Sequence, residues 1–267
     1  MVVVEDAGSR GPSWARNEGL RRATGDVVFF ADADDAVRPR FFSEQLRALD
    51  ATGSDFVLSD FDLSPLKRAY DLRGNEAVRA ALLPAFFGFS FEDVRRWNAG
   101  GDLFARREMG SVWRGAYRRD FLEKNAIRFD ESLRLFEDAA FLAECATRAT
   151  RVISIPESFY DYAPGEKGVV STRHDPDVYC PYKFAALRNR RAIAARAGGD
   201  VMRHFEASAA FSAVELLRAR RGFLRYASDP FVRDALRRFP RSPRHPLVAS
   251  AVSLCRVLSA CASAGAR

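Results

Sequence analysis

Three closely spaced aspartates, Asp32, Asp34 and Asp35, directly follow the apolar run Val27–Ala31. Side chains at positions i and i+2 of an extended chain point to the same side, so Asp32 and Asp34 can share one hard cation. Mg²⁺ and Mn²⁺ prefer such oxygen ligands and leave coordination positions for the phosphates of a substrate. The alternative is a solvated acidic turn in which Asp34 or Asp35 caps the next helix. The aspartates alone leave both interpretations open.

A second acidic pair, Glu137 and Asp138, stands at the start of a helical pattern over residues 136–147. A carboxylate there can serve as a general base that takes the proton of an attacking hydroxyl group. Acidic residues also favour the first turn of a helix because they oppose its dipole. Without further motifs, the pair by itself favours this structural interpretation.

The elements around the aspartates indicate an α/β fold. Val2–Glu5 and Val27–Ala31 have the composition of strands, and Ser13 can N-cap a helix over 14–23 between them. The unbroken apolar character of Val27–Ala31 suits a parallel strand that is buried on both faces. Strand, helix and strand at this spacing form a βαβ unit. Ligands of open α/β sheets bind at the carboxyl ends of parallel strands, where the aspartates lie.

The rest of the chain divides into an α/β part and a helical part. The expected elements are helices at 39–52, 77–83, 118–124 and 136–147, strands at 56–58 and 151–155, and later helices at about 178–197, 201–227, 230–238 and 246–262. A loop rich in glycine and proline over 163–176 separates the two parts. We therefore expect one domain over residues 1–175 and a helical region over residues 176–267.

Charge and composition narrow the partners. The 267 residues carry a net charge of +7, which favours anionic partners such as nucleotide phosphates or an anionic membrane surface. Aromatic residues do not interleave with the arginine clusters, so we expect no nucleic-acid partner. The N-terminus lacks the basic region of a secretory signal, and the four cysteines show neither metal-ligand nor disulfide spacing. These features predict a cytoplasmic protein.

Three sequence blocks resemble the family 2 glycosyltransferases of the GT-A fold. Residues 11–20, 23–26 and 29–35 match the patterns "G-x-S-x-A-R-N-x-G", "A-x-G-[DE]" and "D-x-D-D". Residues 113–138 match "W-x-x-x-Y-R-R … I-x-F … [FY]-E-D", and residues 160–162 match "Y-x-Y". The order and spacing of the blocks make the resemblance specific over residues 2 to about 175. It implies a GT-A-like, Rossmann-like and mostly parallel α/β sheet.

The resemblance implies a metal site. Asp32 and Asp34 would hold Mg²⁺ or Mn²⁺ and, through it, the diphosphate of a nucleotide sugar. Asp35 would help to shape the site. His174 falls in a region where many GT-A enzymes place a metal-binding histidine, and a surface-loop histidine is the alternative.

The resemblance also implies the reaction and its partners. Sugar transfer with inversion from a nucleotide-sugar donor to an acceptor hydroxyl needs a base, which would be Asp138 with Glu137 before it. Arg16 would lie near the nucleotide. A saccharide or lipid-linked saccharide acceptor in cell-surface polysaccharide or glycolipid synthesis fits the family. The arginine clusters at 188–191, 218–221 and 237–244 would then either be ordinary solvated helix faces or contact the anionic inner face of the plasma membrane.

The sequence differs from the family pattern at its N-terminal end. In the best register, Val2–Glu5 is the strand just before the "A-R-N" helix, so the first two βα units of the family would be missing. A wrong start, a fragment or a degenerate protein would each explain this. Two other functions therefore stay open. One is a catalytically inactive remnant that acts as a binding protein, and the other is a phosphatase of the haloacid dehalogenase type with Asp32 as nucleophile.

Overall fold

The computed structural model forms two compact units, residues 1–86 with 108–168 and residues 87–107 with 169–267. It describes residues 8, 10–60, 69–87, 99, 110–163, 176–199, 201–202, 205–206, 208–209, 212–213, 226 and 229–237. The strand expected at Val2–Glu5 and the helix expected at 246–262 lie outside these residues. So does most of the helix expected at 201–227.

Helices and strands alternate along the first part of the chain. The elements are α1 (Pro12–Arg22), β1 (Val27–Phe29), β2 (Ala36–Val37), α2 (Phe41–Thr52), β3 (Phe56–Asp60), β4 (Tyr70–Arg73), α3 (Asn75–Phe87), a 3₁₀ turn (Val112–Arg114), β5 (Gly115–Arg118), α5 (Arg119–Lys124), α6 (Glu137–Arg148), β6 (Arg151–Ser158) and β7 (Tyr160–Asp161). The sequence analysis anticipated most of them but did not expect β4, β5 or the short β2.

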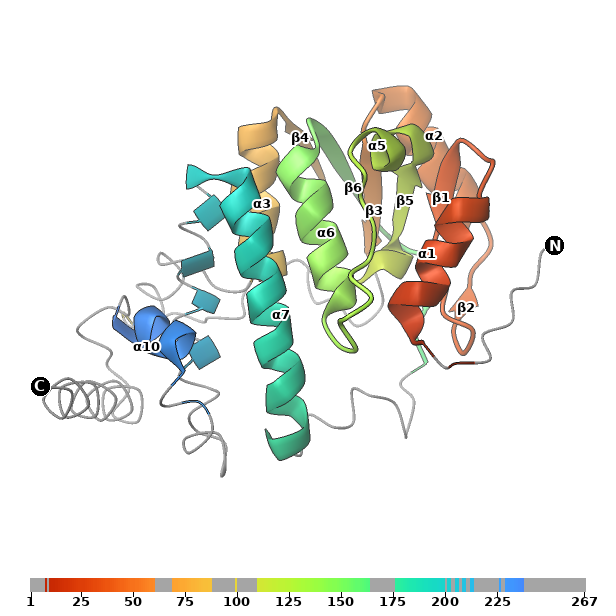
Figure 1. The fold of residues 1–267 in the computed structure, drawn as a ribbon. Helices are drawn as coiled ribbons and strands as arrows, with labels where there is room; N and C mark the ends of the chain where they lie inside the picture. The colour runs from red at the N-terminus through yellow and green to blue at the C-terminus, as the bar shows by residue number, and fades with distance from the viewer. Residues whose placement is uncertain are drawn as a thin grey trace, which may run out of the picture. The chain divides into compact units, whose positions relative to one another are not determined.

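Five strands form one mixed sheet in the order β1-β5-β3-β6-β4 (Figure 1). β1 and β3 both pair antiparallel with β5, and β6 pairs parallel with β3, so β1, β3 and β6 share one direction. β4 runs antiparallel to β6. The α/β class is confirmed, with β5 inserted between two strands of the shared direction.

The sheet is covered on both faces (Figure 1). On one face, Leu49 of α2 packs against Val57, Ala116 and Ile153 of the three central strands. The other face, towards α6, is aromatic, and its rings contact one another at centroid distances between 4.2 and 5.8 Å: Phe30, Phe56, Tyr117, Phe129 and Phe141. All five residues of β3 are buried. This core fixes the strand ends from which the acidic residues emerge.

Helix α1 begins at Pro12, two residues earlier than expected. Its N-cap is Gly11, whose φ of 96° lies in the left-handed region that favours glycine, and Pro12 takes the first helical position. The expectation that Ser13 caps this helix is therefore wrong. Ser13 lies inside the helix, is buried, and donates from its hydroxyl to the carbonyl oxygen of Leu133 at 3.4 Å.

The second unit is described through α7 (Pro176–Ala197) and α10 (Pro230–Arg237), both within two residues of the expected helices. The guanidinium groups of Arg188 and Arg191 lie over the rings of Phe184 and Phe231, at 4.7 and 5.4 Å from the ring centroids. These two arginine side chains thus pack onto aromatic rings of their own unit. Among the described helices, none combines the length and the hydropathy needed to cross a bilayer.

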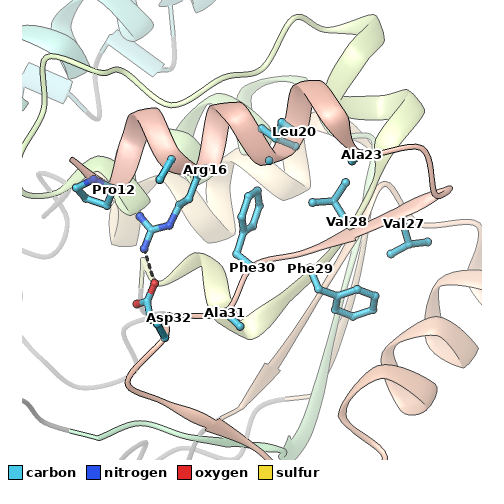
Figure 2. Close-up of a pocket in the computed structure, with 13 residues that line it drawn as sticks. Pro12, Arg16, Leu20, Ala23, Val27, Val28, Phe29, Phe30, Ala31 and Asp32 are labelled. Atoms are coloured by element: carbon cyan, nitrogen blue, oxygen red, sulfur yellow. Dashed lines mark hydrogen bonds and ion pairs between the residues drawn. The ribbon is translucent and has the colours of Figure 1, made fainter. Parts of the chain in front are cut away.

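Strand β1 lies at an edge of the sheet, and β5 is its one partner strand among the described residues. Val27 and Phe29 are accordingly half-buried, whereas Val28 is buried. Burial on both faces, which the apolar run predicted, is thus incomplete. A hollow of about 500 Å³ lies between α1 and β1. Figure 2 shows apolar side chains along most of it and the Arg16–Asp32 pair at one end.

Within the described residues β1 has no second partner strand, and this predicts that the 267-residue chain self-associates, because the backbone groups of an edge strand can pair with another chain. We expect size-exclusion chromatography to show larger species as the concentration rises. Ala31→Lys places a charge in the hollow and should reduce this shift. Ala51→Lys adds the same charge to an exposed position of α2 and should leave the shift unchanged. A parent chain that elutes as a monomer throughout contradicts the prediction.

Candidate functional site

One guanidinium group joins the acidic residues of both motifs. Nη1 of Arg16 donates to Oε1 of Glu137 at 3.0 Å and to Oδ1 of Asp138 at 2.7 Å. Nη2 of Arg16 donates to Oδ1 of Asp32 at 2.8 Å, as Figure 2 shows. The Arg16 side chain is only 12% exposed. Burial alone would lower the pKa of Arg16, but the carboxylates of Asp138 and Asp32 outweigh it and hold this pKa above its ordinary value.

Asn17 fixes the helix that carries Arg16. Its Nδ2 donates to the carbonyl oxygen of Phe129 and to Oε1 of Glu131, both at 2.9 Å. Its Oδ1 accepts from the backbone N–H of Phe129, also at 2.9 Å. The Arg16 guanidinium in turn lies 5.4 Å from the centroid of the Phe129 ring. Arg16 therefore binds the acidic residues, while the adjacent Asn17 binds the segment that leads to α6.

Asp138 lies in the first turn of α6, two residues after Phe136, which has an unusual backbone conformation. Phe136, the N-cap of α6, has a φ of 68°, and this left-handed conformation turns the chain into the helix. Oδ2 of Asp138 accepts from the backbone N–H of Val112 at 3.2 Å. Burial raises the pKa of Asp138 to about 7, although Arg16 lowers it. Such a carboxyl group exchanges its proton near neutral pH.

Gly110 allows the segment before Val112 to approach α6 closely. A Cβ atom at Gly110 would lie 2.9 Å from Cβ of Ala139, the residue that follows Asp138. Real Cβ atoms essentially never approach so closely, and here the neighbour is part of a helix. Glycine at this position is therefore part of what places the Val112 N–H against Asp138.

Tyr160 ties the aspartate loop to the end of the α/β part. Its hydroxyl donates to Oδ2 of Asp35 at 2.8 Å and accepts from the backbone N–H of Asp32 at 3.0 Å. The β2–β7 pair, in which Val37 faces Tyr160, brings these segments together. Oδ1 of Asp35 also accepts from the N–H of Ala163 at 2.8 Å. Asp35 thus shapes the loop through its hydrogen bonds.

Trp113 supports Tyr160 from the other side. The two rings stack with centroids 4.2 Å apart and an interplanar angle of 15°. Tyr162 is also parallel to Trp113, at 5.9 Å. Burial is the main reason that the pKa of Tyr160 rises above its ordinary value, so this hydroxyl stays protonated as a donor to Asp35.

The proposed metal ligands are only partly assembled. Asp32 is paired with Arg16, Asp34 is exposed, and Asp35 is held by Tyr160. His174 lies outside the described residues. Within the described part of the chain, no three side chains of the ligating types are grouped closely enough to hold an ion. Mg²⁺ requires only one or two carboxylates when substrate phosphates complete its shell, so the oxygen donors of Asp32 and Asp34 fit such an ion.

The structure therefore brings together Arg16, Asp32, Glu137 and Asp138, which the sequence placed 122 positions apart at most. The sequence analysis did not assign roles to Asn17, Trp113, Tyr160 or the backbone of Val112. Asn17, Trp113 and Tyr160 stand inside the three blocks that carry the family resemblance. Their presence in the blocks was the available signal, but a side chain that positions others has no recognisable spacing of its own.

Comparison with known sequences finds similarity to one family of enzymes. Residues 2–109 match the sequence profile described as "Glycosyl transferase family 2". The succinoglycan biosynthesis protein ExoO of Rhizobium meliloti (strain 1021) is 30% identical over 158 residues, which are 58% of this chain and 42% of that protein. The uncharacterized glycosyltransferase EpsJ of Bacillus subtilis (strain 168) is 28% identical over 171 residues, covering 62% of this chain and 46% of that protein. The chain thus spans less than half the length of these relatives.

Comparison with solved structures supports the fold. The crystal structure of S. aureus TarS 1–349 in complex with UDP-GlcNAc superposes with a TM-score of 0.51 at 19% identity. The match covers 88% of this chain and 63% of that one. The profile match over residues 2–109 agrees with the family resemblance, and the GT-A-like α/β fold is confirmed.

Asn17→Ala tests the support of the site. The substitution leaves both backbone groups of Phe129 without their partner, so we expect the free energy of unfolding to fall by about 2–3 kcal/mol in urea titrations. Asn125→Ala removes an amide that, among the described residues, bonds to the carbonyl oxygen of Phe121 within its own turn, and should cost about 1 kcal/mol or less. Equal losses in the two variants would show that Asn17 is not a specific anchor.

Proposed function

Because residues 2–109 carry the family 2 glycosyltransferase sequence, we propose that this chain provides the catalytic part of an inverting, metal-dependent glycosyltransferase. It would transfer a sugar from a nucleotide sugar to an acceptor hydroxyl. The observation that carries the proposal is the Arg16 network, which holds the donor-side Asp32 and the base-side Asp138 on one guanidinium group. Transfer from the diphosphate of a nucleotide sugar to an acceptor hydroxyl needs a donor-binding group and a base next to each other.

Asp138 is the proposed general base. Inverting transfer is an in-line displacement at the anomeric carbon, in which the acceptor hydroxyl loses its proton as it attacks. The raised pKa of Asp138, about 7, suits a group that must be ionised before the reaction and protonated after it. Arg16 and the N–H of Val112 orient its two oxygens, one each. Glu137 shares Nη1 of Arg16 and adds negative charge beside the base.

Asp32 and Asp34 are the proposed holders of Mg²⁺ or Mn²⁺, with Asp35 and His174 as further candidates. When bound, such an ion neutralises the charge that develops on a leaving diphosphate. Tyr160 keeps the loop in place through the N–H of Asp32 and the carboxylate of Asp35. Arg16 supplies fixed positive charge at the same end of the hollow.

The partners follow from the relatives and from the charge. TarS 1–349 has been crystallised with UDP-GlcNAc, which supports a nucleotide-sugar donor here. The name of ExoO, a succinoglycan biosynthesis protein, supports a saccharide or lipid-linked saccharide acceptor in cell-surface polysaccharide synthesis. With a net charge of +7, the protein would act in the cytoplasm and approach the anionic inner face of the plasma membrane. We assign donor chemistry to residues 1–175 and membrane or acceptor contact to the helical region 176–267.

Asp34→Ala tests the metal assignment. We expect calorimetry to show Mn²⁺-dependent binding of UDP by the parent chain and loss of that dependence in the variant, because one of the two proposed carboxylate ligands is gone. Asp50→Ala removes an exposed aspartate of α2 and should bind like the parent. Equal Mn²⁺-dependent binding by the Asp34 variant and the parent would overturn the assignment.

Asp138→Asn tests the base. Donor binding should persist, while release of nucleoside diphosphate in the presence of acceptor should fall by about 10²-fold or more. In the parent, the rate should rise with pH through about 7, since only the deprotonated carboxylate accepts a proton. Unchanged turnover in the variant would contradict the assignment. Nucleotide binding without transfer in the parent would instead support the alternative of an inactive, nucleotide-binding remnant.

A further inference from the structure

Arg16 uses its two terminal nitrogens on opposite sides of the site. Nη1 serves both Glu137 and Asp138, at 3.0 and 2.7 Å. Nη2 serves Asp32 alone, at 2.8 Å. The contact with Asp32 can therefore be broken while both contacts of Nη1 remain.

The two sides also differ in their access to solvent. The side chains of Glu137 and Asp138 are 13% and 18% exposed, whereas that of Asp32 is 36% exposed. A cation that arrives from solvent therefore meets the Asp32 end of the network first. The Asp32 carboxylate is also the one that the metal assignment needs.

The charges of the network allow either the Arg16 guanidinium or a divalent ion to pair with the Asp32 carboxylate. Among the described residues, the three carboxyl groups pair with one guanidinium group, so the network has a surplus of negative charge when Asp138 is deprotonated. A partly buried surplus of this kind attracts a second cation. However, a divalent ion beside Asp32 would stand close to the Arg16 guanidinium, and like charges at such short range repel strongly. Because of this repulsion, the two cations compete for the Asp32 carboxylate, whose Oδ1 accepts from Nη2 of Arg16.

We propose that Arg16 is a resident cation that occupies Asp32 in the metal-free protein, and that a divalent ion binds by displacing Nη2 from that carboxylate. The inference rests on the proposed metal role of Asp32. Nη1 keeps Arg16 attached to Glu137 and Asp138 throughout. Arg16 is thus a positioning residue, which holds the acidic residues together when no metal is bound and sets how tightly the metal binds.

Arg16→Gln tests this competition through metal binding, without any assay of activity. We expect calorimetric titration of the full chain with Mn²⁺ alone to show affinity about tenfold tighter than in the parent, because the competing cation is removed. Arg38→Gln is the matched control, since Arg38 pairs with Asp161 next to Tyr160 and carries the same charge. Its Mn²⁺ affinity should change by about twofold or less.

Thermal unfolding gives a second, independent measurement. In EDTA, Arg16→Gln should lower the Tm by at least about 5 °C, because three carboxylates lose their shared cation. Saturating Mn²⁺ should recover most of this loss and should raise the Tm of the parent far less. If Arg16→Gln does not fold, Arg16→Lys serves in its place, because it keeps the charge but not the forked geometry. Its Mn²⁺ affinity should rise by about threefold.

The outcomes separate the inference from the proposed function. If the parent binds Mn²⁺ and neither Arg16 variant binds it more tightly than Arg38→Gln does, the inference is wrong and the metal assignment stands. If neither the parent nor any variant binds Mn²⁺, both are wrong. Tighter binding in the Arg16 variants, with recovery of the Tm, supports both.

Discussion

The Arg16 guanidinium is the contact on which the arrangement of the site depends. It joins the end of β1, through Asp32, to the start of α6, through Glu137 and Asp138. No hydrogen bond of the sheet links these two elements, because β1 pairs with β5 and α6 lies on a face. Besides the contact between the Phe30 and Phe141 rings, one partly buried ionic network joins these two elements. Its partly buried charges would be costly if any partner were missing.

The rest of the structure holds that guanidinium in place from two directions. Asn17 ties α1 to the segment before α6, and the aromatic core beneath it, with Phe129 stacked on Phe141 at 4.2 Å, makes that segment rigid. On the opposite side, Tyr160 and Trp113 hold the aspartate loop. Asp32, Asp35 and Asp138 thus each have at least one neutral hydrogen-bond partner that does not compete for their charge.

The sequence predicted the elements better than their assembly. Apolar periodicity located α2, α6 and α7, because each helix has a clear buried face or clear end signals. β4 and β5 were missed because short strands without long apolar runs resemble loops. The motifs singled out Asp32, Glu137 and Asp138, but the Arg16 network that joins them spans up to 122 positions. Spacing along the chain carries no information on such a contact, and the family resemblance placed Arg16 only near the nucleotide.

The shared guanidinium also constrains how this chain can change over generations. Substitution of Arg16 leaves three carboxyl groups without their shared cation. Substitution of Asp32 or Asp138 leaves the partly buried arginine with fewer anionic partners. Intermediates with one substitution are therefore less stable than either end point. We expect the four positions 16, 32, 137 and 138 to be inherited as a block, either retained together or lost together.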